Sequence, residues 1–356
     1  MRRLQMKILF QSIILSAILF SLMACAALEK DNEPKEPNEV KAEVKTQLDV
    51  YRPLVKAQAD SHGLMVMGGS IGDSALFSCL ARFSGAADFD PAILFRSGQP
   101  IRHPDYGPIV DGKKTRGPIS RDMVAGILYC LLDLHRDGDT DHALDLASAM
   151  IDFGKAHKLT VGTEIGWLFC TEEDRTAYGI TDEDWFGRCW MTPSVVKDIY
   201  RVAKMVGLAC DADCQFYSTV GANIPADKTG FERHLAVIAT VRNGLVDGGI
   251  NDNSLKIVLQ KAAESQPRNG LYQAAYHLYG DGNQEAAFAA LSDEALFPRD
   301  KLPTRANYCS DYLFQRDDDS AQPDADWLPC GDDSLGSEGR GIEWTFAACL
   351  ALGECL

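Results

Sequence analysis

Apolar residues recur every three or four positions along most of the chain, and this spacing constrains the fold more than any other feature. It is strongest in Ser120–Arg136 (SRDMVAGILYCLLDLHR), and such spacing places side chains on one face of an α-helix. The best strand signals, Leu64–Met67 and Leu94–Arg96, are weak. Helices are predicted at Asp73–Phe83, Ser120–Arg136, His142–Ala156, Ser194–Val206, Phe231–Leu245, Ser254–Glu264, Gly270–Tyr279, Gln284–Ser292 and Ile342–Leu352. We therefore expect an all-α fold.

One turn between helices occurs twice. Leu134–Ala143 (LHRDGDTDHA) is echoed by Leu278–Ala286 (LYGDGNQEA), and in each an Asp-Gly ends one helix before a side-chain cap starts the next. This pattern predicts antiparallel helical hairpins. The Asp-rich DGDTD also resembles a calcium-binding loop, but it lacks the distal glutamate at the required spacing, which favours the plain turn.

Repeated hairpins of irregular length, without a repeat consensus, favour a compact toroid over an open solenoid. In architecture and loop style the chain resembles the six-hairpin α/α-toroid class of bacterial glycosidases and polysaccharide lyases, although no family motif can be aligned residue by residue. The resemblance implies a helical-hairpin α/α toroid with long, disulfide-stapled loops. It also implies a central cleft at one end, formed by helix N-termini and loops.

The first 24 residues have the layout of an export signal. A basic start (Arg2, Arg3, Lys7) precedes an apolar stretch from Ile8 to Met23, which is short for a membrane span. The junction LMAC, ending at Cys25, resembles the lipobox of bacterial lipoproteins. That resemblance implies cleavage before Cys25, acylation of Cys25 by diacylglycerol and an N-acyl chain such as palmitate, and a lasting membrane anchor.

Residues 25–46 are rich in Lys, Glu, Asn and Pro and bury too little surface to fold, so a flexible charged tether is predicted there. A folded domain is predicted over 47–356. Ala26 follows the lipidated cysteine, which in lipoproteins suggests the outer membrane; the anchored domain then faces the periplasm or the cell surface. Without the signal, 32 basic side chains remain against 51 acidic ones, a net charge of −19. This balance argues against nucleic-acid partners and still permits a basic cleft for acidic polysaccharide.

Ten cysteines remain besides Cys25. An even number behind an export signal indicates disulfides in an oxidising compartment, although sequence does not fix their connectivity. A zinc site is the alternative, but there is no CxxC pair and no histidine cluster near the cysteines. No metal or cofactor is therefore expected. Spacing suggests the pairs Cys170–Cys189, Cys210–Cys214, Cys309–Cys330, Cys349–Cys355 and, by remainder, Cys79–Cys130.

Two helix starts carry candidate carboxylates. Asp73 ends a glycine-rich stretch (GGSIGD) that lacks the phosphate-loop lysine, so Asp73 either caps the helix or lies close to a ligand. Ser120 and Asp122 suit the N-cap and first turn of a helix, where a hydroxyl accepts an N–H and an acid faces the positive end of the dipole. Arg121 opposes that dipole, which suggests an ion pair or a bound anion.

The loop before Ser120 holds further polar residues, and a loop of this length is often functional. Asp73 and Asp122 are a minimal pair for inverting glycoside hydrolysis. Alternatively, His103 with Tyr106 or Arg116 would abstract the proton beside a uronate carboxylate, the arginine neutralising the developing charge.

Two other segments are candidates. Phe231–Leu235 (FERHL) has Glu232 and His234 two positions apart, on different helix faces, so they are not a metal pair. Residues 307–330 mix aromatic and polar side chains around the loop that the predicted Cys309–Cys330 disulfide closes; these side chains suit sugar rings, or they pack on the folded domain. The predicted substrate-binding residues of this loop are Asn307, Tyr308, Arg316 and Trp327.

The leading hypothesis is an anchored envelope lipoprotein that hydrolyses or eliminates polysaccharide, with Asp73, His103 and Asp122 as catalytic candidates and Tyr106, Arg116 and Arg121 as binding candidates. The alternatives are a non-catalytic lipoprotein that binds glycan or another envelope component, and a purely structural envelope protein.

Overall fold

The computed structural model describes residues 36–66, 71, 74–107, 109–110, 113–114, 119–178, 189–221, 224, 226–227, 230–302 and 337–356. The chain divides into two units, Met1–Val40 and Lys41–Leu356. The contacts below all belong to the second unit.

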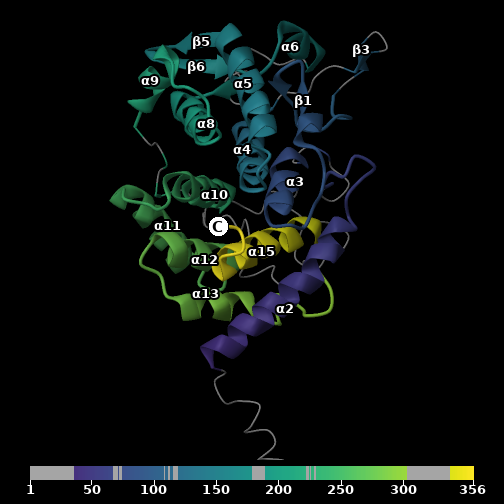
Figure 1. Ribbon diagram of the computed structural model, residues 1–356, viewed down its shortest axis with the longest axis vertical. Helices are drawn as coiled ribbons and strands as arrows, with labels where there is room; N and C mark the ends of the chain where they lie inside the picture. Colours follow the sequence, from purple (N-terminus) through teal and green to yellow (C-terminus); the bar gives the residue numbers. More distant parts are fainter. Residues whose placement is uncertain are drawn as a thin grey trace, which may run out of the picture. The chain divides into compact units, whose positions relative to one another are not determined.

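Helices dominate the described residues (Figure 1). The helices are α2 (Pro37–Lys56), α3 (Ser74–Phe83), α4 (Arg121–Arg136), α5 (Thr140–Ala156), α6 (Glu172–Tyr178), α8 (Pro193–Met205), α9 (Ala212–Ser218), α10 (Gly230–Asp247), α11 (Asn253–Ser265), α12 (Gly270–Tyr279), α13 (Gln284–Leu291) and α15 (Ser337–Leu352), with the 3-10 helix η1 (Pro91–Leu94). All nine helices predicted from apolar spacing are present, most with ends within two residues of the expected ones.

The predicted tether extends too far, because helix α2 begins at Pro37 and takes in residues up to 46. The reason is an apolar stripe that composition alone concealed: Val44, Leu48, Tyr51 and Val55 recur at helical spacing and are all buried. The charged residues between them lie on the other face of the helix. An amphipathic surface helix has this pattern.

In the part of the chain that the structure describes, the strands are short and form three small antiparallel sheets. These are β1 (Phe95–Arg96) with β2 (Gln99–Pro100), β3 (Ile109–Val110) with β4 (Lys113–Lys114), and β5 (Lys158–Val161), β6 (Glu164–Leu168) and β7 (Trp190–Met191) in that order. Part of the expected Leu94–Arg96 strand is β1. The β5–β6–β7 sheet was not predicted, because β6 is buried over Gly166–Leu168 and does not alternate. The fold is thus predominantly helical with small sheets.

Six helices contact one another in a closed cycle. α3 contacts α4, α4 contacts α8, α8 contacts α10, α10 contacts α12, α12 contacts α15, and α15 contacts α3 (Figure 1). Helix α5 packs on α4, α9 on α8, α11 on α10 and α12, and α13 on α12 and α15. From α4 to α15, most helices that belong to the cycle are followed in the chain by a helix that packs against the cycle from outside.

Helices α3 and α4 run parallel and lie very close together. A disulfide joins Cys79 to Cys130, with the Cα atoms 4.9 Å apart. One turn further along both helices, Arg82 Nε lies 2.9 Å from Asp133 Oδ2. A Cβ on Gly126 would lie 2.4 Å from the Leu76 Cα, so only glycine permits this approach.

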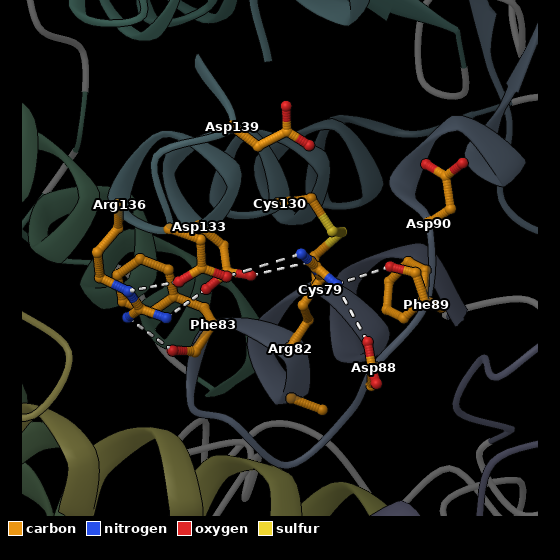
Figure 2. A network of polar contacts seen from close by, with 12 residues as sticks. Cys79, Arg82, Phe83, Asp88, Phe89, Asp90, Cys130, Asp133, Arg136 and Asp139 are labelled. Atoms are coloured by element: carbon orange, nitrogen blue, oxygen red, sulfur yellow. Dashed lines mark hydrogen bonds and ion pairs between the residues drawn. A yellow bond between two sulfur atoms is a disulfide. The ribbon is translucent and has the colours of Figure 1, made fainter. Parts of the chain in front are cut away.

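Beyond the disulfide, the two helices share an ionic network (Figure 2). Arg82 and Arg136 each bind one oxygen of the Asp133 carboxylate, whose residue is 2 % exposed. Arg136 also donates to the Phe83 carbonyl at 2.9 Å, and its guanidinium lies 4.6 Å from the Phe83 ring centroid. Arg82 donates to the Phe89 carbonyl at 2.7 Å. The network ties the end of α3 to the end of α4.

Helices α8 and α10 also run parallel. Asp198 pairs with Arg242, and further along both helices Arg201 pairs with Asp247. Because the bonded positions advance together on the two helices, their N-terminal ends lie on the same side.

Helices α10 and α15 are parallel for the same reason. His234 faces Glu343, and one turn further along, Ile238 and Phe346 both meet Tyr129. The Tyr129 hydroxyl donates to the Ile238 carbonyl at 2.7 Å, and the Tyr129 and Phe346 ring centroids are 5.2 Å apart. Tyr129 thus joins α4 to α10 and α15 inside the core.

The disulfide predictions are confirmed where the structure describes the cysteines. The fifth predicted pair, Cys309–Cys330, lies outside the described residues. The four pairs are Cys79–Cys130, Cys170–Cys189, Cys210–Cys214 and Cys349–Cys355.

Candidate functional site

Several predicted site residues lie outside the described part of the chain: Asp73, Arg116, Asn307, Tyr308, Arg316 and Trp327, together with the lipidation candidate Cys25. Four remain, namely His103, Tyr106, Arg121 and Asp122. His103 and Tyr106 belong to a turn after β2, whereas Arg121 and Asp122 begin α4.

A carboxylate missed by the sequence analysis organises the surroundings of His103. Asp60 follows α2 in a tight turn, where its Oδ1 accepts the backbone N–H groups of His62 at 2.8 Å and Leu64 at 2.9 Å. Its Oδ2 lies 2.7 Å from His103 Nε2. One side chain therefore shapes its own turn and holds a second loop 43 residues away.

His103 is 1 % exposed and has both ring nitrogens engaged. The backbone N–H of Asp105 donates to His103 Nδ1 at 3.0 Å, so Nδ1 is the acceptor nitrogen. Nε2 then carries the ring proton and donates to Asp60. In this arrangement neither nitrogen of His103 is available to a substrate.

His62 forms a second pair with Asp105, and this pair is exposed. His62 Nε2 lies 3.0 Å from Asp105 Oδ2, with side chains 31 % and 48 % exposed. The rings of His62 and His103 meet edge to face, 5.4 Å between centroids. No hydrogen-bond partner of His62 Nδ1 lies in the described residues. We call Asp60, His62, His103 and Asp105 the His–Asp cluster; each of its two loops supplies one histidine and one aspartate.

The Asp60 carboxylate is stabilised in its charged form. Burial alone favours the neutral acid, but hydrogen bonds from the Leu64 N–H, the His103 ring and the His62 N–H outweigh it, so the pKa of Asp60 lies below its usual value. A charged Asp60 keeps the buried His103 ring in one orientation. The inner half of the cluster is therefore held rigidly.

Arg102 connects the cluster to the start of α4. Its guanidinium donates to the Ser120 hydroxyl at 2.8 Å and lies 5.6 Å from the Tyr106 ring centroid. Ser120 occupies the N-cap as predicted, but its side chain makes no capping hydrogen bond. The predicted cap interaction is wrong, because the hydroxyl serves Arg102 instead.

Arg121 and Asp122 follow at the first turn of α4. Arg121 is exposed, and no ion-pair partner for it lies among the described residues; Asp122 is partly buried and near the positive end of the helix dipole. No contact joins either side chain to His103 in the described part of the chain. The Arg102–Ser120 hydrogen bond is what brings the two predicted regions together.

A separate polar pair lies in the helical core. His234 Nε2 is 2.8 Å from Glu343 Oε1, and both side chains are almost completely buried, at 0 % and 1 % exposed. They come from the N-terminal halves of α10 and α15. The FERHL segment thus contributes His234 to a buried histidine–glutamate contact, and its partner on α15 was not predicted.

Neither metal ligation nor membrane crossing is indicated by the part of the chain that the structure describes. No cluster of three or more His, Cys, Asp or Glu side chains there has the geometry to hold a metal ion. No described helix combines the length and apolar character needed to span a bilayer.

No protein-family model, no curated protein and no solved structure matches the chain.

The sequence carried a weak signal for the His–Asp cluster. Asp60 and His62 form D-x-H, and His103 and Asp105 form H-x-D; the partners of each pair are 43 positions apart in the sequence. Local periodicity does not reveal which two loops meet. His62 therefore went unnoticed, although within the His–Asp cluster it is the histidine with a ring nitrogen that no described residue binds.

Proposed function

We propose that the protein is a membrane-anchored envelope lipoprotein that cleaves acidic polysaccharide by elimination, with His62 as the general base. The observation that carries this is the His62–Asp105 pair, in which an exposed imidazole is oriented by a carboxylate. Such a pair is the usual arrangement for a histidine that removes a proton. The buried Asp60–His103 pair holds the two loops in place and acts as a positioning element.

The proposed step is proton abstraction beside a uronate carboxylate. His62 Nδ1 takes the proton from the carbon next to the carboxylate, and the electrons of that C–H bond form a C=C bond. The bond from the neighbouring carbon to the glycosidic oxygen breaks, and that oxygen leaves with a proton from solvent or from an acid. A carboxylate neutralised by a cation makes this proton more acidic.

Arg102 supplies positive charge next to His103 of the cluster, and Arg121 supplies a second cation at the start of α4, in a chain that is acidic overall. Arg102 is fixed by Ser120 and stacked with Tyr106, and Arg121 opens α4 where a helix start also favours anions. These groups suit a carboxylate on the substrate. We give Arg102 the neutralising role that the sequence analysis assigned to Arg116.

The cycle of six helices supports an α/α toroid as the finer description of the fold. Within each parallel pair of that cycle the helix N-termini lie on the same side, and the toroidal enzymes that the chain resembles carry their sites at helix N-termini. The proposed location rests on sequence alone: acylation of Cys25 on the LMAC junction, and the outer membrane on Ala26, which follows that cysteine.

A second candidate is glycan binding without catalysis. It is favoured by the hydrogen bonds within the His–Asp cluster, because three of the four imidazole nitrogens already have partners there. A cluster of this kind also suits a rigid binding surface.

A substrate screen with the purified mature chain separates these functions. Neutral and uronate-containing polysaccharides are incubated with the protein, and both unsaturated uronate absorbance and reducing-end release are followed. Unsaturated uronates from acidic polymers support the proposal. Reducing ends without unsaturation indicate hydrolysis instead, and binding without either product supports the second candidate.

A further inference from the structure

Helix α2 is fastened to the rest of the second unit by long polar side chains on two sides of its buried stripe. On one side, the Gln47 side chain donates to the Phe297 carbonyl at 2.9 Å, and the Tyr51 hydroxyl donates to the Pro298 carbonyl at 2.6 Å. Tyr51 also packs on Trp344 of α15, with 4.6 Å between ring centroids. These contacts hold α2 against the segment that follows α13.

On the other side, two cations of α2 converge on one carboxylate near the C-terminus. Lys45 Nζ lies 2.7 Å from Glu354 Oε1, and Arg52 Nη1 lies 3.0 Å from Glu354 Oε2. Arg52 also donates through Nε to the Ser84 carbonyl at 2.8 Å. Glu354 therefore binds α2 at two positions about two turns apart.

The turn that presents Glu354 is closed covalently. Cys349, within α15, is bonded to Cys355, and both are 1 % exposed. The Glu354 N–H donates to the Cys349 carbonyl at 2.9 Å, and Gly353 adopts φ +74°, a backbone conformation that favours glycine. The Cys349–Cys355 bond therefore limits how far the turn that carries Glu354 can open.

We propose that this disulfide-closed turn is a clip that holds α2 in place, and that α2 is the joint between the N-terminal segment and the folded body. The buried apolar stripe alone permits sliding or peeling of a single surface helix. Opposed polar contacts at Glu354 and at the 297–298 carbonyls fix its position and resist a pull from the N-terminal side. This proposal does not depend on the proposed polysaccharide chemistry.

Hydrogen–deuterium exchange of the mature chain tests the clip. We expect C349S/C355S to raise exchange of the amides in 41–56 by about tenfold relative to the unmodified protein. The matched control is C210S/C214S, which opens another short disulfide, at α9, and should leave α2 unchanged. Unaltered protection of α2 in C349S/C355S would overturn the proposal, and so would an equal loosening of every helix.

A second variant keeps the disulfide and removes only the charge. E354Q should increase exchange in 41–56 several-fold, because two ion pairs are lost. Its control is E172Q, which removes an exposed ion pair with Arg175 on α6. If E354Q exchanges like E172Q throughout α2, Glu354 does not hold the helix and the clip is wrong.

Discussion

Asp60 is a partly buried carboxylate surrounded by N–H donors, and Asp133 is a fully buried carboxylate between two arginines. Their pKa values shift in opposite directions. Burial raises the pKa of Asp133 to about 6, and the nearby Arg136 and Arg82 offset only part of that effect. At Asp60, burial is outweighed by hydrogen bonds, and the pKa is lowered. Hydrogen bonds from N–H groups outweigh the effect of modest burial on the pKa of Asp60. Two guanidinium groups do not offset the effect of deep burial on the pKa of Asp133.

The difference in pKa corresponds to a structural role for Asp133 and a role near the candidate site for Asp60. Asp133 joins two helices that are already linked by a disulfide, and nothing around it is open to a ligand in the described residues. Asp60 orients a loop whose outer histidine is exposed. The comparison predicts that changes at Asp133 act on stability and changes in the His–Asp cluster act on function.

The largest expected stability effect is at Asp133. D133A leaves Arg82 and Arg136 without their shared counter-charge, which should lower the free energy of unfolding by about 3 kcal/mol. Urea unfolding measures this change. Activity per folded molecule should be unaltered; a D133A protein that is as stable as the parent would remove the contrast with Asp60.

Asp60 should give a smaller loss of stability and a larger loss of function. D60A removes the acceptor of three N–H groups, which should cost about 2 kcal/mol, and it frees the His103 ring. The loss of glycan turnover or binding should be much larger than the fraction of D60A molecules that are unfolded. Thermal unfolding and the substrate assay on the same sample separate the two effects.

The pH dependence of stability should differ in sign at the two sites. The folded pKa of Asp133 lies above the unfolded value, so between about pH 4 and 6 the folded state binds the extra proton and its contribution is lost as pH rises. The lowered pKa of Asp60 contributes stability above the unfolded value that is lost as pH falls through the folded value.

D133N makes this contrast measurable. Its free energy of unfolding should lack the decline between about pH 4 and 6 that Asp133 gives to the parent protein. Denaturant unfolding at a series of pH values checks the slope. Identical slopes in D133N and the parent would show that Asp133 does not titrate in this range.

The smallest expected effect concerns helix starts. Ser120 does not cap α4, so S120A should cost less than the roughly 1 kcal/mol of a lost cap. Asp252 accepts the Ser254 N–H at 2.8 Å and does cap α11, so D252A should cost about that full amount. Equal losses in the two variants would mean that Ser120 stabilises α4 after all.

Sequence reasoning located the helices because apolar spacing is a local property, and Gly270–Tyr279 was predicted to the residue. It missed α2, because charged residues masked the stripe from Val44 to Val55. It also missed Asp60, His62 and Glu343, whose roles arise only when loops or helices distant in sequence meet. His103 was found, but its burial and its two bonded nitrogens are properties of the folded chain.

The central claim, that His62 is the reactive member of the His–Asp cluster, is tested most directly by H62Q beside H142Q. His142 is a matched control, since it is 30 % exposed and also lies near two aspartates, Asp90 and Asp139. On the acidic polysaccharide that the screen identifies, release of unsaturated uronates should fall at least about 100-fold in H62Q and stay near the parent rate in H142Q. Equal rates in the two variants would contradict the assignment of His62 as the base.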